Sequence, residues 1–315
     1  MNDIIKRMDH RLTPKWALLL CVPPLMWAGN AVVGRLMVGL VPPLTLNLLR
    51  WAVALLILIP LGLHALRTAE QRAALWERRW WLALIGLLGV GVYNALQYGA
   101  LVSSTPLNTT LIAASSPLWM LVVGTVFFGQ RITATNSAAA LLSLAGVCTV
   151  VSKGTPWSLI DLDWVVGDIM MVLAAVSWSF YSWLLAKPPA ALSTGVPKPG
   201  DDWAGFLLVQ TLFGIGWAAA AAAGEQLIAP TPVDWSPSVV GAILFVAVCP
   251  SILAYRCWGM GVAHLGPAVT AFFGNLSPLF AALLQIALLG ELPRIHHVLA
   301  FALILSGIAV SSLRR

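Results

Sequence analysis

Long apolar runs separated by short polar stretches dominate this chain. A helix needs about 20 apolar residues to cross the hydrocarbon core of a bilayer. Ten runs approach or exceed that length and predict ten transmembrane helices, at 16–38, 43–64, 80–101, 106–128, 133–151, 164–186, 203–224, 237–259, 266–289 and 294–313. Several joints between the runs are very short, so neighbouring helices are expected to form antiparallel hairpins. The predicted fold class is an all-α polytopic membrane protein with ten transmembrane helices.

The pattern of Pro, Thr, Ser and Gly residues within these runs occurs twice, at a constant spacing of 161 residues. The first copy is Pro106, Thr109, Ser116, Pro117, Leu118 and Gly129, and the second is Pro267, Thr270, Ser277, Pro278, Leu279 and Gly290. The same spacing relates Gly146 to Gly307. A duplicated hydrophobic bundle is typical of a secondary transporter.

The duplication also predicts the domain organisation. We expect an N-terminal arm (1–15), a first five-helix repeat (16–152), a connecting loop (153–163) and a second five-helix repeat (164–313) with a flexible loop at 188–202. Because five is an odd number, the second repeat is expected to be inverted in the membrane relative to the first. Inverted repeats are related by a pseudo-two-fold axis in the membrane plane, and the substrate site lies near that axis.

Composition supports a bilayer environment. Apolar residues make up 59% of the chain and charged residues 10%, whereas soluble domains are roughly a quarter charged. The four Cys residues lie in apolar runs without metal-ligand spacing, so we interpret them as small core residues and expect no metal or cofactor. No basic run faces aromatic stacking residues, so nucleic-acid binding is not expected.

The positive residues predict an orientation. If the chain has ten spans and a cytoplasmic N-terminus, 14 of the 18 Lys and Arg residues lie on the cytoplasmic side, as the positive-inside rule requires. Both termini are therefore predicted to be cytoplasmic. The sequence leaves a monomer and a homodimer open.

Two segments of the repeats carry a shared signature. They are ALQYGALVSSTPLNTTLIAASSPLWMLVVGTVFFGQRIT (95–133) and LAYRCWGMGVAHLGPAVTAFFGNLSPLFAALLQIALLGELP (253–293). Each holds a Pro-containing helix that ends in a Phe/Leu-Gly-Glu-like corner, 128–130 and 289–291, and the helix openings at 27–37 and 167–187 also fit. The chain resembles the EamA repeat of the drug/metabolite transporter superfamily over residues 14–313, and within it looks most like the YddG-type amino-acid exporters. Gln130 stands where the first repeat usually has Glu, so no role of that carboxylate is carried over.

Pro117 and Pro278 fall about midway along their predicted helices. A proline inside a helix removes the hydrogen bond to the carbonyl four residues earlier, here that of Ala113 or Gly274. Freed carbonyls at this depth must face protein or water. We predict a symmetric pair of hinges whose carbonyls line a cavity, with a simple packing kink as the alternative.

Polar and aromatic residues at mid-depth predict a substrate cavity, since polar groups there usually face inward. Two pairs with i, i+3 spacing lie in equivalent helices of the two repeats, Trp27 with Asn30 and Trp178 with Tyr181. The other candidates are Asn94, Gln97, Tyr98, Ser251, Tyr255, Asn275 and Ser277. Aromatic walls with a few amides and hydroxyls are typical of a small-molecule pocket, and hydrogen bonding between helices is the alternative for each residue.

Charged residues are rare inside the predicted spans. No Asp or Glu lies at the centre of any span, which suits a net-neutral substrate. Arg35 and Arg50 lie in outer parts of their helices and are expected to extend to the interface. The alternative for Arg50 is an ion pair with Asp168, at similar depth, as an outer gate.

The predicted function is export of amino acids, with aromatic and other neutral ones among them, across the bacterial inner membrane by alternating access. The alternative is a transporter of another small metabolite or of a drug cation within the same superfamily. A phosphorylated solute would need Lys or Arg in the cavity, and the motifs of an intramembrane enzyme are missing, so an enzyme is not expected. Without a central carboxylate, facilitated export or exchange is expected rather than proton antiport.

Overall fold

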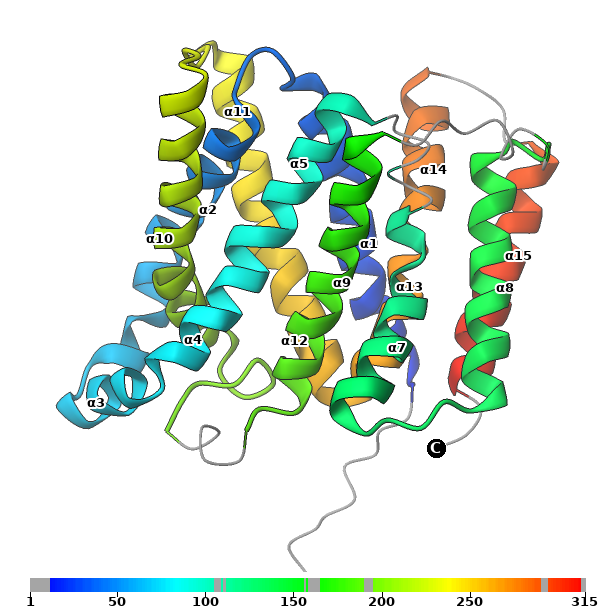
Figure 1. The fold of residues 1–315 in the computed structure, drawn as a ribbon. Coiled ribbons are helices and arrows are strands. Elements are labelled where there is room, and N and C mark those ends of the chain that lie inside the picture. The colour runs from blue at the N-terminus through cyan, green and yellow to red at the C-terminus, as the bar shows by residue number, and fades with distance from the viewer. Residues whose placement is uncertain are drawn as a thin grey trace, which may run out of the picture.

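The computed structural model describes residues 12–104, 109, 112–155, 157, 165–189, 195–289 and 294–312. Within these ranges all regular structure is helical (Figure 1). The first part comprises α1 (Pro14–Leu36), α2 (Pro43–Gly62), η1 (Leu63–Leu66), α3 (Ala69–Glu77), α4 (Arg79–Gly86), η2 (Leu87–Val92), α5 (Tyr93–Ser103), α7 (Ser116–Phe128) and α8 (Ala134–Val151). The second comprises α9 (Val166–Ala186), α10 (Trp203–Ile228), α11 (Pro237–Val246), η5 (Ala247–Leu253), α12 (Ala254–Leu265), α13 (Pro267–Gly274), α14 (Ser277–Leu289) and α15 (Ile295–Ser312).

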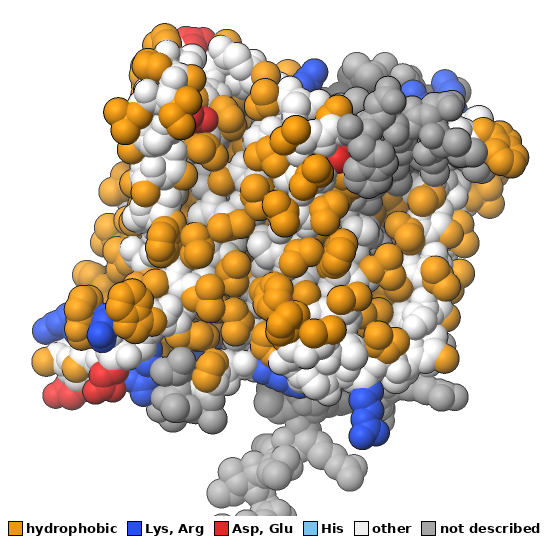
Figure 2. All heavy atoms as spheres, viewed as in Figure 1, with side chains coloured by type: hydrophobic (Ala, Val, Ile, Leu, Met, Phe, Trp, Pro, Cys, Tyr) orange, Lys and Arg blue, Asp and Glu red, His pale blue; other side chains and the backbone are white. Residues whose placement is uncertain are grey.

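Seven helical segments in the described ranges are long and apolar enough to cross a membrane, and three more apolar helices are shorter. The shorter ones are 116–128, 134–149 and 295–311. A band of hydrophobic side chains crosses the middle of the visible face, and most of its charged side chains lie toward the two ends of the bundle (Figure 2). The structure is therefore that of a polytopic helical membrane protein, and the count of ten complete spans stays a prediction.

The two repeats pack against each other reciprocally. In the first repeat α1 contacts α12 and η5 of the second, and in the second repeat α9 contacts α5 and η2 of the first. Further contacts between the repeats include those of α2 with α10, α7 with α13, and α8 with α15. Helices α1 and α9, which open the two repeats, run in opposite directions (Figure 1). This is the packing expected of two inverted copies.

Helices α8 and α15 cross at a symmetric pair of glycines. A Cβ placed on Gly146 would lie 2.9 Å from the carbonyl oxygen of Ala300, and one on Gly307 would lie 2.8 Å from that of Ala139. Small residues allow helix backbones to approach closely where lipid offers no hydrophobic driving force. The glycines related by the 161-residue spacing thus perform the same packing role on both helices.

Pro117 and Pro278 lie at helix breaks rather than inside continuous helices as predicted. Each occupies the first turn of a helix, α7 or α14, where N–H groups have no intrahelical acceptor and proline is tolerated. A turn at Ser115 precedes α7, and turns at 275–276 separate α13 from α14. The breaks therefore coincide at equivalent depths of the two repeats, and hinge motion at them stays a prediction.

The third helix of each repeat contains a π-helical segment that the sequence did not lead us to expect. The segments are η2 and η5, at equivalent positions in the two repeats. In η5, Pro250 has no N–H to donate to the carbonyl of Val246, and the hydroxyl of Ser251 donates to that carbonyl instead, at 2.6 Å. Pi-helical turns inside α-helices are frequent at functional sites.

A short surface helix, α3, was also missed. It begins with a capping box in which the side chains of Thr68 and Gln71 satisfy each other's backbone N–H groups. The four-residue Thr-x-x-Gln spacing was a readable signal in the sequence. Several sequence predictions lie outside the described residues, among them those on Pro106, Gly290 and the connecting loop from 158 to 163.

Candidate substrate cavity

A cavity opens between α1, α5, α9, α12 and the broken helices α7 and α13–α14. The cavity has a volume of about 110 Å³, counted as the space that the centre of a water-sized sphere can occupy. This is room for several water molecules. The polar and aromatic residues of its wall are Trp27, Tyr93, Gln97, Thr109, Ser116, Trp178, Trp258, Asn275 and Ser277. Ala and Gly residues make up most of the remaining wall, and none of the described lining residues is charged.

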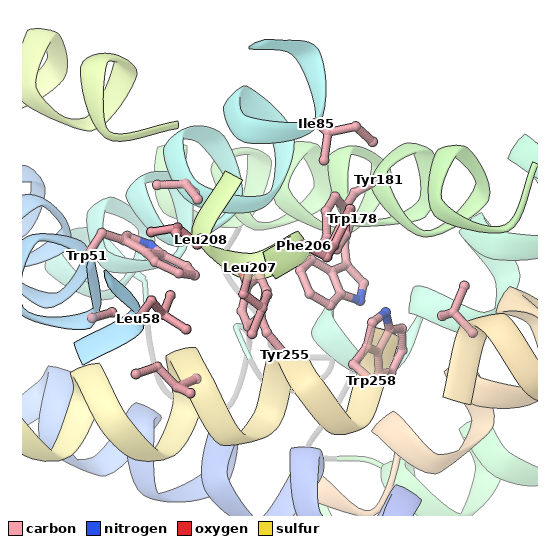
Figure 3. Packing of buried hydrophobic residues seen from close by; sticks show 14 of the residues in the cluster. Trp51, Leu58, Ile85, Trp178, Tyr181, Phe206, Leu207, Leu208, Tyr255 and Trp258 are labelled. Atoms are coloured by element: carbon pink, nitrogen blue, oxygen red, sulfur yellow. The ribbon is translucent and has the colours of Figure 1, made fainter. Parts of the chain in front are cut away.

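A cluster of aromatic rings centred on Trp178 forms one wall of the cavity and extends behind that wall. Trp178 and Tyr181 project from α9, and Tyr255 and Trp258 from α12, toward the same space (Figure 3). The ring centroid of Trp178 lies within 5.4 Å of the centroids of Trp27, Tyr93, Tyr181, Tyr255 and Trp258. Such a wall offers apolar contact and π-faces that attract a cationic group.

Two indole nitrogens and a phenol of this cluster donate hydrogen bonds to neighbouring helices. Trp27 Nε1 donates to the carbonyl of Pro250 at 3.4 Å, and Trp258 Nε1 donates to Ser182 Oγ at 3.1 Å. Tyr255 donates its hydroxyl proton to the carbonyl of Gly89. Pro250 and Gly89 are equivalent positions of the two π-helical segments, 161 residues apart. The carbonyls at these segments therefore hold the aromatic wall in place from both repeats.

Amide groups from α5 and the α13–α14 break contribute the polar part of the wall. Gln97 is half-buried, and its Oε1 accepts from Asn30 Nδ2 at 3.3 Å. Asn275 is 2% exposed, and its Nδ2 has no hydrogen-bond partner in the described part of the chain. Two amides thus stand at the same cavity as the aromatic cluster.

Behind this wall lies Arg50, whose side chain is 0% exposed. Its Nε donates to Ser251 Oγ at 2.8 Å, and its Nη1 donates to Asn94 Oδ1 and to Tyr98 Oη, both at 2.9 Å. Its Nη2 has no hydrogen-bond partner among the described residues. The prediction that Arg50 extends to the membrane interface is therefore wrong, because these groups from α5 and η5 draw it inward.

The predicted gate between Arg50 and Asp168 is absent from this conformation. Asp168 lies in the first turn of α9, fully buried, where its carboxylate accepts from the hydroxyl of Ser104 and from the backbone N–H of Val165 at 2.9 Å. It thus stabilises the start of the helix, as an acidic residue near a helix N-terminus does. Arg35 is exposed and donates to the carbonyl of Leu101 at 3.3 Å.

The structure divides the predicted cavity residues into two groups. One group lines the cavity and comprises Trp27, Gln97, Trp178, Asn275, Ser277, Ala113, Gly274 and Pro278. The other does not line it and comprises Asn30, Asn94, Tyr98, Tyr181, Ser251, Tyr255 and Pro117, of which all but Pro117 belong to side-chain hydrogen-bond networks. The carbonyl of Ala113 is not free as predicted, because Ser116 Oγ donates to it at 2.5 Å.

Sequence reasoning missed several residues of the site. Tyr93 and Trp258 complete the aromatic wall, and Thr109 and Ser116 line the cavity on the side of α7. Tyr93 lies four residues before Gln97 and Trp258 three after Tyr255. These helical spacings place them beside residues already selected, and so were a usable signal.

Apolar helices in two reciprocal repeats, enclosing an aromatic cavity whose described lining residues carry no charge, define a membrane carrier of small molecules. The chain belongs to the EamA-like transporter family, which matches residues 14–152 and 165–313. The resemblance to the EamA repeat is thereby confirmed, and the family is one of transporters rather than enzymes.

Curated relatives are distant but cover most of the chain. An uncharacterized transporter of Archaeoglobus fulgidus is 24% identical over 96% of this chain and 99% of its own length. The aromatic amino acid exporter YddG of Ancylobacter novellus is 23% identical, over 92% of this chain and 94% of its own length. A probable terminal-alkyne amino-acid exporter of Streptantibioticus cattleyicolor is 28% identical, over 74% of this chain and 73% of its own length.

A solved structure shares the fold. A crystal structure of another protein superposes with a TM-score of 0.71 at 22% identity, covering 96% of this chain and 98% of that chain. The likeness extends over both repeats and supports the arrangement of helices described above.

Proposed function

We propose that this protein exports neutral amino acids, including aromatic ones, across the bacterial inner membrane with both termini in the cytoplasm. The observation that carries the proposal is the cavity itself, which sets four aromatic rings and two amides together without a charged side chain among its described lining residues. A zwitterion fits such a site, because its ammonium group can lie on an aromatic face and its carboxylate can accept from amides.

The relatives support the same class of substrate. Two of them are described as amino-acid exporters, one of aromatic amino acids. The reciprocal packing of the repeats supports alternating access, since a site between two inverted halves can open to either side when the halves rock. The cavity wall contains residues from both repeats, as that mechanism requires.

The test is exchange of radiolabelled amino acids by the purified protein in proteoliposomes, with Thr, Met, Leu, Phe and Trp as the panel. We expect saturable exchange of at least one member. A matched pair of glycine variants links the activity to the cavity. Gly274 lines it, and a Cβ there meets nothing within 4 Å, so Gly274→Leu fills the cavity without a backbone clash. Exchange is expected to fall about tenfold or more.

The control is Gly241→Leu on α11. A Cβ added to that glycine also meets nothing within 4 Å, but the residue is exposed on the outside of the bundle. The variant should retain exchange and folding. If well-folded protein exchanges none of the five amino acids, they are excluded as substrates, and other small metabolites or drug cations become the candidates.

A further inference from the structure

We propose that Arg50, acting through Tyr98 and Asn30, orients the amide of Gln97 so that Gln97 and Asn275 donate hydrogen bonds to a carboxylate group of the transported molecule. This inference rests on the proposed function and names the group by which the cavity recognises its substrate. Arg50 is a positioning residue in this scheme, because it does not line the cavity.

The direction of the hydrogen bonds identifies the donor. A guanidinium group has only donors, so every chain of hydrogen bonds that starts from it has a fixed direction. Tyr98 Oη accepts from Arg50 Nη1 and must therefore donate onward, which it does to Asn30 Oδ1 at 2.8 Å. Asn30 is left with its Nδ2 as a donor, and that group donates to Gln97 Oε1. The Nε2 group of Gln97 is then the donor end of the chain, and no described residue accepts from it.

Two other chains leave Arg50, and both end on backbone acceptors. One runs through Ser251 to the carbonyl of Val246. The other runs through Asn94 and Tyr255 to the carbonyl of Gly89. Of the three chains, the one through Tyr98 and Asn30 ends at Gln97, a residue of the cavity wall whose Nε2 donor has no acceptor among the described residues. Arg50 therefore directs one polarised donor into the cavity.

Asn275 supplies an independent sign of a ligand. Its Nδ2 is buried and has no partner among the described residues, although it belongs to the same cavity. Leaving a buried donor unsatisfied is costly, and a ligand acceptor would remove that cost. Two amide donors at one cavity, with a buried positive charge behind one of them, select an anionic acceptor. A carboxylate has two oxygens and can accept from both amides.

The experiment measures binding by calorimetry to the full-length protein in lipid nanodiscs, with two ligand pairs, leucine with leucinamide and tryptophan with tryptophanamide. The amides keep the side chain and ammonium group but lack the carboxylate. The wild-type protein should bind each acid about 10- to 100-fold more tightly than its amide. Gln97→Glu or Asn275→Asp should reverse that preference, because a carboxylate in the wall repels the acid and accepts from the amide ligand.

Tyr98→Phe tests the role of Arg50 as a positioning residue. It removes the hydroxyl that connects Arg50 to Asn30 and keeps the ring. The preference for acid over amide should fall several-fold, while the affinity for the amide stays the same. A loss of folding would lower both affinities together, so the ratio separates the two effects. The matched control for Gln97→Glu is Gln226→Glu at the end of α10. Gln226 lies outside the cavity, so this variant should keep the wild-type preference for the acid over its amide.

The outcomes distinguish the two proposals. If amino acids bind but acid and amide bind equally well, or if Gln97→Glu and Asn275→Asp keep the preference for the acid, the carboxylate site is refuted and the carrier function stands. If neither member of either pair binds, the proposed function is refuted, and this inference with it.

Discussion

At the scale of single residues, the buried guanidinium of Arg50 is held by neutral groups in the described part of the chain. Its hydrogen-bond partners are a serine, an asparagine and a tyrosine, and its Cζ lies 5.6 Å from the ring centroid of Trp51 and 5.8 Å from that of Tyr98. An ion at this depth costs several kcal/mol unless its surroundings compensate it. Side chains that accept hydrogen bonds and aromatic faces supply that compensation here. Because these groups are neutral, they do not cancel the charge of Arg50, and its positive potential extends to the cavity.

Trp178 is the residue with the most ring contacts in the cavity wall, and its loss should affect stability and binding together. Trp178→Ala leaves a void among the surrounding rings and should lower the free energy of unfolding by about 3–5 kcal/mol, while Trp178→Phe should cost less. The measurement is the Tm in detergent together with the affinity for tryptophan. Trp235→Ala is the control, because Trp235 is 63% exposed and should change neither quantity. An unchanged Tm for Trp178→Ala would contradict the packing described here.

At the scale of elements, the irregular segments come in symmetric pairs. Both fourth helices break before a proline, and both third helices carry a π-helical segment. The sequence signals differ between the copies, however. Pro250 explains the segment in η5, whereas the equivalent residue in η2 is Gly89. A Cβ on Gly89 would lie 2.7 Å from Gln210 Nε2 and 2.8 Å from Tyr181 Cε2, so these two side chains would have to move to admit a larger residue.

The close crossing of α8 and α15 predicts that one added methyl group lowers the stability of the protein. Gly307→Ala would place a Cβ 2.8 Å from the carbonyl oxygen of Ala139, so the two helices must separate. The cost should be about 1–3 kcal/mol, and the Tm in detergent should fall. Gly224→Ala in α10 is the matched control, because its Cβ meets nothing within 4 Å and alanine favours a helix. Equal Tm values for both variants would show that α8 and α15 tolerate a wider spacing.

At the scale of the whole molecule, the residues that meet in the centre are often equivalents of each other. Asn94 and Tyr255 occupy the same position in the two repeats and form a hydrogen bond of 3.1 Å. Trp27 and Trp178, from the equivalent helices α1 and α9, are in edge-to-face contact. Residues on a two-fold axis must meet their own equivalents. The candidate site therefore lies where the two repeats join, and rocking of one repeat on the other would change it directly.

The absence of charge among the described lining residues of the cavity also predicts how transport is driven. No described lining residue of the cavity is Asp, Glu, His or Lys, so the site offers no carrier for a coupled proton. Uptake into proteoliposomes down a substrate gradient should proceed at the same rate with and without an imposed pH gradient. The rates should also be equal with a protonophore present. A substrate-dependent proton flux, recorded with an internal pH dye, would contradict this expectation.

The membrane fold class, the duplication and the family could be read from the amino-acid sequence alone, because they depend on the length of apolar runs and on residues repeated at fixed spacing. The sequence also selected many of the residues that meet at the centre. It did not determine which of them face the cavity and which stand behind it, since helical periodicity gives a face but not the neighbour that the face meets. The inward turn of Arg50 and the free donor of Gln97 came from the structure instead, because their hydrogen-bond partners stand on helices distant in the sequence. That Pro117 and Pro278 open new helices also came from the structure, since a proline in a long apolar run fits either a kink inside a helix or the first turn of a new one.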